Sequence, residues 1–588
     1  MSRKGVRIGG ASGFWGDSSV AVPQLVRQGN VKYLVFDYLA ELTMSILAKA
    51  RIKNPEQGYA VDFVDTMKSM LPEISQSGIR VIANAGGVNP RGCAAALAAV
   101  AAELGIDTKI AVVVGDDVMP QIEGLRTENP SAAIPPRILS ANAYLGALPI
   151  KRALDEGAAI VVTGRCVDSA VTLGALMHEF GWSETDYDKL AAGSLAGHII
   201  ECGCQATGGL HTDWRKVPRW SEIGYPIVEA YADGTFISTK PENTGGLVNS
   251  AVISEQILYE VGDPSRYILP DVVCDFTQVK LRQVGKDQVE VSGVMGLPPT
   301  TSYKVCATYP DGYRCFTTLT VVGYDAAEKA QKTGEAILGR TRALFKANGY
   351  ADYTDTKIEI LGAESGYGPH SRAAYAREVV LRLAVSHRER QALELFAREL
   401  GPAGTSWAPG VTGVGGRPKV SPGINACSFL LPKTRLSPSV WIGDTELGVD
   451  IPPGTEAQGP GQSAGKDIPI MLDGDVESVP LVALAYGRSG DKGDTANIAI
   501  ILRRPEYLPY VRSQVTAERV ATYLSHLIRG KVTRYEAPGI HAFNFLCEEA
   551  LAGGVAASLR NDPWGKTMAP LLLSMPVTVP RGLVITED

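Results

Sequence analysis

The first 170 residues repeat one pattern of hydrophobic and polar positions. Each repeat has a short β-branched, apolar run, a break of Gly, Asn or Asp, and a longer stretch with helical periodicity. Five such runs are predicted strands: Val6–Ile8, Tyr33–Phe36, Ile79–Ala83, Lys109–Val114 and Ala159–Thr163. Their starts lie roughly 25 to 50 residues apart, which leaves room for a helical crossover between neighbours. We therefore predict a large α/β domain built on a mainly parallel sheet.

The pattern changes near residue 235, where a sub-boundary is compatible with the sequence. From there to residue 450 short alternating runs predict strands, and helical periodicity near Ala326–Ala347 and Ser371–Leu400 predicts two helical runs. This mixture indicates an α+β extension, so that residues 1–450 form one large α/β domain with an added α+β part.

A second, smaller domain is predicted at the carboxyl end of the chain. Residues 451–477 are mostly Pro, Gly and polar residues without periodicity, which is the composition of a linker. Residues 478–588 contain apolar runs at Leu481–Tyr486 and Asn497–Leu502, followed by an amphipathic stretch near Ala517–Leu527. This order is compatible with a ferredoxin-like α+β domain.

Composition and charge exclude several classes of protein. The chain of 588 residues carries 57 Lys and Arg against 63 Asp and Glu, and it has no basic block, so nucleic-acid binding is not expected. The nine cysteines are scattered and odd in number, which favours a reducing compartment over a disulfide framework. The basic amino terminus lacks an apolar signal-peptide region, and the longest apolar stretch is too short to span a bilayer. We expect a soluble, cytoplasmic protein without a membrane partner.

The candidate chemistry lies at the ends of the predicted strands. In parallel α/β proteins, ligands bind outside the carboxyl ends of the strands. The polar residues and glycines at these ends are Gly13 and Asp17, Asp37 and Glu41, Asn84 with Gly86 and Gly87, Asp116 and Asp117, and Arg165 and Asp168. Some of them could simply begin turns and cap helices. Two pairs of acids, Asp37 with Glu41 and Asp116 with Asp117, exceed what capping requires, so we predict a convergent polar site.

Familiar nucleotide and hydrolase motifs are not present. The first loop runs Gly10-x-x-Gly13-x-x-Gly16 rather than G-x-G-x-x-G, and bulky Phe14-Trp15 stands where a pyrophosphate would approach, so NAD and FAD are disfavoured. Gly565-Lys566-Thr567 lacks the upstream glycine of a phosphate-binding P-loop, and no G-x-S-x-G motif occurs. Residues 488–497 could form either an anion-binding backbone nest or a charged hairpin loop.

A second constellation lies between residues 197 and 211. It contains two of the seven histidines with a carboxylate and thiols, and the weak candidates for metal ligands are His198, Glu201, Cys202 and His211. Such a set could bind Zn²⁺ or Fe²⁺, although no standard ligand spacing is met. The alternatives are a buried structural histidine, or His198 and Glu201 acting as acid and base without metal.

Several motifs together resemble one family. They are Gly-Phe-Trp-Gly-Asp-Ser at residues 13–18, Phe36-Asp37-Tyr38-Leu39-Ala40-Glu41, Asn84-Ala85-Gly86-Gly87-Val88-Asn89-Pro90, Gly115-Asp116-Asp117, Gly164-Arg165 with Asp168, Gly197-His198 with Glu201-Cys202-Gly203, Tyr259-Glu260 with Asp263-Pro264, and Pro270-Asp271-Val272. With these motifs the chain resembles the acyclic terpene utilisation family (AtuA). Its carboxyl-terminal part, with Arg488-Ser489-Gly490-Asp491-Lys492-Gly493-Asp494, Gly553-Gly554 and Gly565-Lys566-Thr567, resembles the ferredoxin-like domain of that family. The resemblance implies a role in the catabolism of branched, acyclic terpenoids such as citronellol and geraniol through CoA thioesters.

The residues suggest how such a substrate could be handled. Our hypothesis is a lyase or hydratase that acts on a branched, unsaturated acyl-CoA or acid by removing the proton next to the carbonyl group. The candidate bases are Asp37, Glu41, Asp116, Asp117 and Glu201, with His198 as the partner acid. The backbone N–H groups of Gly86 and Gly87 and the guanidinium of Arg165 could hold the oxyanion or a substrate carboxylate. CoA would enter as part of the substrate, with no certain cofactor beyond a divalent metal as a weak alternative.

Two other functions stay open at this point. One is a non-catalytic protein that binds acyl-CoA or acts as a scaffold for an acyl-CoA carboxylase. The other is a metal-dependent hydrolase centred on His198. The small domain suits pairing between copies of the chain, which favours a homo-oligomer.

Overall fold

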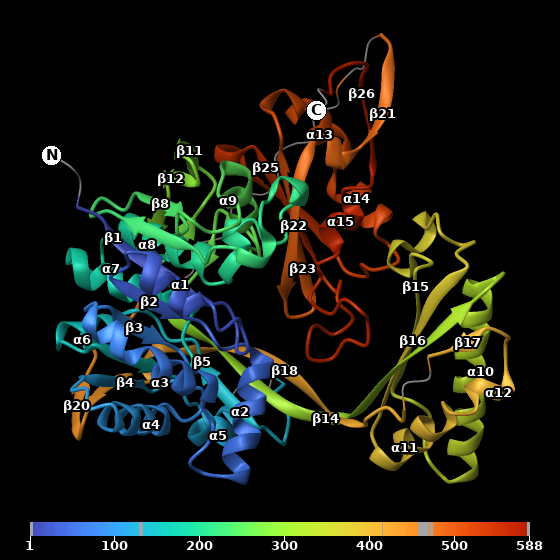
Figure 1. Ribbon diagram of the computed structural model, residues 1–588, viewed down its shortest axis with the longest axis horizontal. Coiled ribbons are helices and arrows are strands. Elements are labelled where there is room, and N and C mark those ends of the chain that lie inside the picture. Colours follow the sequence, from blue (N-terminus) through green and yellow to red (C-terminus); the bar gives the residue numbers. More distant parts are fainter. Residues whose placement is uncertain (1–3, 129–132, 414–415, 457–469, 471–473, 585–588) are drawn as a thin grey trace.

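The computed structural model describes residues 4–128, 133–413, 416–456, 470 and 474–584. Most of the predicted linker, residues 457–469 and 471–473, lies outside the described residues. Figure 1 shows a body of sheet and helices, an outer lobe on one side of it, and the carboxyl-terminal domain beside both. We use "outer lobe" for residues 313–420. Within the described ranges, no helix combines the length and the apolar character that crossing a bilayer requires.

The body is built on an open sheet of eleven strands, as far as the described residues extend. Five central strands are parallel and confirm the predicted sheet. In spatial order they are β1 (Val6–Ser12), β2 (Tyr33–Phe36), β3 (Arg80–Ala83), β6 (Ile160–Thr163) and β4 (Ile110–Val114). Antiparallel strands extend both edges: β7 (Ile227–Ala230), β8 (Phe236–Thr239), β12 (Gln288–Ser292) and β11 (Lys280–Gly285) beside β1, and β19 (Ser439–Ile442) and β20 (Thr445–Gly448) beside β4.

Helices cover both faces of the parallel strands, which is why these strands are apolar at nearly every position. In β2, Tyr33 and Val35 face one hydrophobic core while Leu34 and Phe36 face the other. The second of these cores includes residues of α1 (Ala21–Gln28), α2 (Glu41–Lys53), α3 (Val61–Gln76) and α4 (Pro90–Glu103). The first includes residues of α6 (Leu148–Asp155), α7 (Ala170–Phe180), α8 (Tyr187–Ile200) and α9 (Ser250–Ile257).

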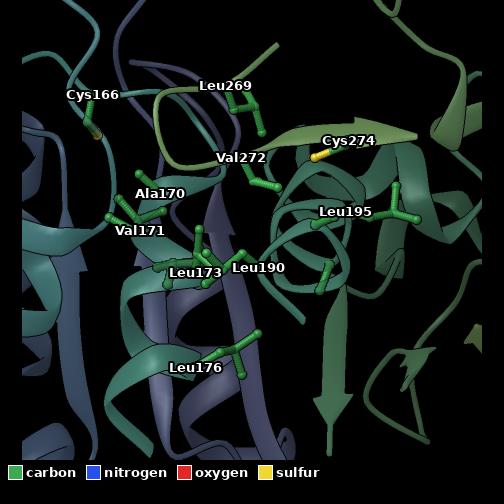
Figure 2. Packing of buried hydrophobic residues seen from close by; sticks show 14 of the residues in the cluster. Cys166, Ala170, Val171, Leu173, Leu176, Leu190, Leu195, Leu269, Val272 and Cys274 are labelled. Carbon is green, nitrogen blue, oxygen red and sulfur yellow. The ribbon is translucent and has the colours of Figure 1, made fainter. Parts of the chain in front are cut away.

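Helices α7 and α8 are apolar around most of their circumference because they lie deep in this core. Figure 2 shows Leu173 of α7 directed toward Leu190 of α8, with Val272 and Leu269 packed above them. Every residue from Leu190 to Ile200 in α8 is buried. The polar residues near the carboxyl end of α8 are therefore held in a rigid, water-poor setting.

One long strand connects the body with the outer lobe. Strand β14 (Ser302–Val322) pairs with β5 (Ser140–Ala143) in the body and with β16 (Glu378–His387) in the outer lobe (Figure 1). Its other partners are β18 (Ser421–Pro432) and β17 (Val411–Thr412), and β15 (Asp355–Leu361) completes the sheet. The helices of the outer lobe are α10 (Ala326–Ala347), α11 (Arg390–Glu399) and α12 (Ala403–Ser406).

The prediction of a helical run over Ser371–Leu400 is wrong in its first half. Glu378–His387 is strand β16, and helix α11 begins only at Arg390. Val379, Leu381 and Leu383 alternate with less buried residues, which is the two-residue period of a strand. The predicted helix at Ala326–Ala347 is confirmed as α10.

The carboxyl-terminal domain has its own core and a four-stranded antiparallel sheet. The strands, in spatial order, are β22 (Ala485–Lys492), β23 (Thr495–Leu502), β25 (Ala542–Cys547) and β24 (Val532–Ala537). The helices are α13 (Leu508–Gln514), α14 (Ala517–Tyr523) and α15 (Met568–Leu572), and β21 (Val476–Pro480) pairs with β26 (Pro576–Pro580). Between β22 and β23 the chain forms a tight hairpin at Gly493, whose φ of +68° suits glycine.

Buried amides join this domain to the segment that follows α9. The Asn497 side chain accepts the N–H of Glu260 at 2.9 Å and donates to the Leu258 carbonyl at 2.6 Å. Asn544 donates to the carbonyls of Val261 and Gly262 at 2.7 and 2.6 Å. These bonds give the segment around Glu260 a defined position against the carboxyl-terminal sheet.

Replacing Asn497 with the similarly sized Leu is expected to lower the free energy of unfolding by about 2 kcal/mol or more. The substitution removes both bonds to the segment and leaves buried backbone groups without partners, each costing about 1–3 kcal/mol. Chemical denaturation measures the change. Asn561→Leu, at an exposed position, is the control, and equal stability of the two variants would contradict the expectation.

Candidate functional site

The carboxyl ends of β2 and β3 bring Asp37 and Asn84 together. The Asn84 amide nitrogen donates to Oδ1 of Asp37 at 2.5 Å, while its oxygen accepts the Tyr38 N–H at 2.7 Å. Asn84 is fully buried and Asp37 is 8% exposed. Asn84 therefore orients the Asp37 carboxyl group, as expected for adjacent parallel strand ends.

The loop after β6 places Arg165 over the same edge of the sheet. Its backbone N–H donates to Oδ2 of Asp116 at 2.8 Å, and its guanidinium lies 2.8 Å from Oδ1 of Asp168. The guanidinium also stacks 4.1 Å from the ring centroid of Tyr144. Asp116 holds the backbone and Asp168 the side chain, so the cation of Arg165 is positioned from both ends.

Tyr144 connects Arg165 with Glu41 at the start of α2. The Tyr144 hydroxyl donates to Oε1 of Glu41 at 2.8 Å, and the ammonium of Lys304 on β14 lies 5.1 Å from the Tyr144 ring. Burial alone would raise the pKa of Glu41, but Lys304 and Arg165 outweigh it and lower this pKa to about 2. Glu41 is thus a permanent anion that balances these cations.

Near the end of α8, His198 and Glu201 form a buried pair. Nδ1 of His198 lies 2.9 Å from Oε1 of Glu201, and Nε2 lies 3.1 Å from the Gln256 carbonyl oxygen. A carbonyl can only accept, so Nε2 carries a proton and the Nδ1 side faces the carboxyl group. Gly197 allows this placement, because a Cβ there would come within 2.8 Å of the backbone of Ser169.

The fifth part of the site comes from the carboxyl-terminal domain. The ammonium groups of Lys492 and Lys566 lie 3.6 Å from Oε2 and 3.7 Å from Oε1 of Glu260, respectively. Glu260 has a φ of +57°, which is strained for a residue with a side chain. The Lys566 ammonium also contacts the hydroxyl of Tyr259. Two lysines of one domain therefore flank a single carboxylate of the other.

These groups share one electrostatic environment. Burial raises the pKa of Asp37 well above its usual range, Asp168 and Glu201 raise it further, and Arg165 opposes them. Burial raises the pKa of Asp491, next to Lys492, to about 8, with Glu260 adding to the shift and Lys492 opposing it. The same recess thus holds Asp491, whose carboxyl group keeps its proton near neutral pH, and Asp37, whose pKa is raised, beside Glu41, which is ionised.

The His198–Glu201 pair also binds protons more tightly than usual. Burial lowers the pKa of His198, but the charge and hydrogen bond of Glu201 outweigh it, so the pKa is raised. Burial raises the pKa of Glu201, and His198 opposes this only in part. Nδ1 of His198 and the carboxyl group of Glu201 therefore share a proton.

The site opens toward solvent between the two domains. The side chains of Lys492, Lys566 and Asp168 are 41%, 33% and 32% exposed, whereas those of Arg165 and His198 are 5% and 2% exposed. The lysines and Asp168 therefore contact solvent, whereas the Arg165 and His198 side chains are buried. We call this region the interdomain recess.

Some of the predicted residues have other roles. Asp117 is exposed and accepts the N–H of Met119 at 2.9 Å, as a turn residue does. With Asp116, Arg51, Arg91 and Asn142 it lines a cleft of about 200 Å³. Asp116 itself is buried between Asn142 and the Arg165 backbone, and burial raises its pKa to about 6. Asp116 positions Arg165 rather than facing the recess.

The glycines and Asp17 shape the loops. The N–H groups of Gly86 and Gly87 donate to the carbonyls of Thr163 and Asn84, so the prediction that they hold an oxyanion is not supported by this geometry. Asp17 accepts the Gly13 N–H at 2.9 Å and the Tyr225 hydroxyl at 2.7 Å. These bonds organise the first loop. Among the described residues, no hydrogen bond joins Asp17 to the carboxyl groups of the recess.

The two histidines of the 197–211 segment lie in different surroundings. Nδ1 of His211 lies 3.0 Å from Glu255, which also lies 3.4 Å from Arg488 of the carboxyl-terminal domain. Cys202 has a raised pKa because it is buried near Glu201 and Glu260. In the described part of the chain, no three His, Cys, Asp or Glu side chains are grouped as metal ligands. His198 and His211 are thus paired with different carboxylates, Glu201 and Glu255.

Several residues of the recess were not predicted. Tyr144 and Lys304 follow β5 and begin β14, two segments without a clear sequence signal, while Glu260 and Lys566 stood out only as parts of short motifs. Asp491 and Lys492 lie at the end of β22, so the segment 488–497 is the charged hairpin rather than a nest. The short motifs that carry the family resemblance in each domain were the signal available for finding Glu260, Asp491, Lys492 and Lys566.

Fold and site together define a two-domain α/β protein with an acid- and lysine-rich recess between its domains. Residues 6–442 match the family described as acyclic terpene utilisation family protein AtuA, and residues 479–578 match the AtuA ferredoxin-like domain. The chain therefore belongs to the AtuA family, which is implicated in acyclic terpene utilisation. No curated protein and no solved structure matches it.

The proton-binding tendency of Asp491 predicts a pH-dependent effect of Asp491→Asn on stability. The folded-state pKa of about 8 lies above the unfolded value near 4, so the folded state binds the proton more tightly. As the pH rises from about 4 to about 8, this group makes the wild type progressively less stable, whereas asparagine does not titrate. The stability advantage of the variant should grow across that range.

Thermal unfolding measured between pH 5 and 9 tests this expectation. Asp107→Asn, at an exposed position, is the matched control. A difference between Asp491→Asn and the wild type that stays constant with pH would show that Asp491 does not carry a raised pKa.

Proposed function

We propose that this protein is a catabolic enzyme for branched, acyclic terpenoid acids or related carboxylic acids. It acts as a lyase or hydratase on a branched, unsaturated acyl-CoA or free acid bound in the interdomain recess. The observation that carries the proposal is the convergence, from both domains, of carboxyl groups with opposite protonation beside fixed cations. Pairs of acids whose surroundings push their pKa values apart are typical of sites where protons are exchanged with a substrate.

The recess contains groups for each part of such a reaction. Removing a proton next to a carbonyl requires a base, and Glu201 with its partner His198 is suited to this because its raised pKa makes it a stronger base. Loss of a hydroxyl group requires an acid, and burial favours the protonated form of Asp37 by raising its pKa well above its usual range. The negative charge that develops on the carbonyl oxygen requires a cation, which Arg165 supplies.

The loops around the recess support these roles. Asn84 orients Asp37, Asp116 orients the Arg165 backbone, and Gln256 orients His198. Each reactive side chain is thus held by a second, buried polar group. A site of this construction keeps reacting groups in one geometry during the reaction.

The proposal predicts that Asp37→Asn abolishes most of the turnover. Loss of a general acid costs about 10²- to 10⁴-fold in rate, while the amide keeps the size of the side chain. The matched control is Asp117→Asn, which removes an exposed carboxylate that follows β4, outside the recess, and should leave turnover unchanged.

Turnover is measured with CoA thioesters and free acids derived from citronellol and geraniol, after a thermal-shift screen of the same compounds. Binding at about a hundredfold excess over the dissociation constant stabilises the native protein by about 2.7 kcal/mol. Folded Asp37→Asn protein that turns over substrate as fast as Asp117→Asn would contradict the proposal.

The outer lobe favours one alternative, a non-catalytic acyl-CoA-binding or scaffold partner of an acyl-CoA carboxylase. Tyr324, Tyr375 and Phe316 of this lobe are 73%, 93% and 43% exposed, and exposed aromatic residues are typical of docking surfaces. A wild-type protein that binds the thioesters without converting any of them would support this alternative.

A further inference from the structure

Lys566 lies on a loop whose structure is fixed by hydrogen bonds. Asp562 accepts the backbone N–H of Lys566 at 3.1 Å and that of Thr567 at 2.7 Å. The neighbouring Gly565 has a φ of +65°, and its carbonyl accepts the Ser489 hydroxyl at 2.6 Å. The loop therefore directs the Lys566 side chain toward the body from a fixed base.

The amine end of Lys566 is surrounded by groups that can move protons. It contacts the hydroxyl of Tyr259 and lies 4.1 Å from the centroid of that ring. Glu260 is 3.7 Å away, and its other carboxylate oxygen faces Lys492 at 3.6 Å. With 33% of its side chain exposed, Lys566 is accessible from the recess while Tyr259 is buried.

We propose that Lys566 is a nucleophile that forms an imine with an aldehyde or ketone group of the substrate. This inference rests on the function proposed above and narrows it: the substrate is an acid or thioester that also carries a carbonyl group, and the bond broken is a carbon–carbon bond. A lysine placed beside a second cation and a tyrosine hydroxyl is suited to this chemistry.

The imine forms by an addition step followed by a dehydration step. The neutral Lys566 nitrogen adds to the carbonyl carbon, the carbonyl electrons move to oxygen, and this oxygen takes the proton of the Tyr259 hydroxyl. The nitrogen then returns one proton to the Tyr259 oxygen, which leaves a neutral carbinolamine. Its C–O bond breaks as protonated Glu260 gives a proton to the departing oxygen, so that water, an iminium ion and a Glu260 carboxylate result.

The iminium ion then allows cleavage. Its positive nitrogen accepts the electrons of the bond between the neighbouring carbon and a hydroxyl-bearing carbon, while Glu260 takes the hydroxyl proton. The products are an aldehyde and an enamine. Glu260 returns the proton to the enamine carbon, which restores the iminium ion. Water then adds to the iminium carbon and the C–N bond breaks, which releases a ketone or aldehyde, the neutral Lys566 amine and one proton that Glu260 takes up.

The pKa shifts of Lys566 and Glu260 have the directions that imine formation requires. Burial lowers the pKa of Lys566 to about 8, although Cys202 opposes the shift, so part of the amine is neutral near neutral pH. Burial raises the pKa of Glu260, with Lys492 opposing the shift. The lowered pKa of Lys566 favours the neutral amine that the addition step requires, and the raised pKa of Glu260 favours the protonated acid that the dehydration step requires.

The test is reductive trapping on the full-length protein. The protein is incubated with acetone and cyanoborohydride near pH 7, which converts an imine into a stable isopropylamine, and the modified lysines are located by peptide mass spectrometry. We expect the label to concentrate at Lys566. The comparison site is Lys332, a 72% exposed lysine of the outer lobe.

Two variants complete the design. Lys566→Arg keeps the charge and should lose the label, whereas Lys332→Arg should keep it. Labelling of Lys566 no stronger than that of Lys332 in the wild type overturns the inference without needing either variant to fold. Turnover that Asp37→Asn abolishes, with no label at Lys566, would leave the proposed function standing and reject the imine.

Discussion

The structure depends on balancing buried charge across a domain boundary. The body brings Asp37, Glu41, Asp168, Glu201 and Glu260 toward one edge of its sheet, and burying so many carboxyl groups without cations would be very costly. Arg165 and Lys304 offset part of this charge from within the body, and Lys492 and Lys566 approach Glu260 from the other domain. The raised pKa of Asp37 favours its neutral form, which reduces the buried negative charge further. The charged groups that stabilise the contact between the two domains are therefore the same groups that are available for chemistry in the recess.

The parallel part of the fold could be predicted from the sequence because it depends on local patterns. A strand buried on both faces, such as β2, is a continuous apolar run, and each run is followed by a helix. Strand β14 was not predicted as a unit. Its 21 residues pass through two different environments, so its burial follows no single period, and its partners β5, β16 and β18 are far away in the sequence.

The candidate site also has a part that could be predicted from the sequence and a part that could not. Asp37, Asn84 and Arg165 could be predicted because carboxyl ends of parallel strands meet at one edge. Asp117 shows the limit of that rule, since the residue next to buried Asp116 points to solvent and serves a turn. Lys492 and Lys566 could not be placed, because the docking of one domain on another is determined by surface complementarity and leaves no periodicity in either segment.

Strand β14 has a mechanical consequence. Its first part carries Lys304, beside Tyr144, and its last part forms the sheet of the outer lobe. Arg382 of that lobe donates to the Leu559 carbonyl at 2.7 Å, so the carboxyl-terminal domain is supported by the outer lobe as well as by the body. Each of the three parts contacts the other two, and β14 connects the body with the outer lobe. A rotation of the carboxyl-terminal domain that moved Lys492 and Lys566 away from Glu260 would therefore have to bend β14 or break the hydrogen bond of Arg382.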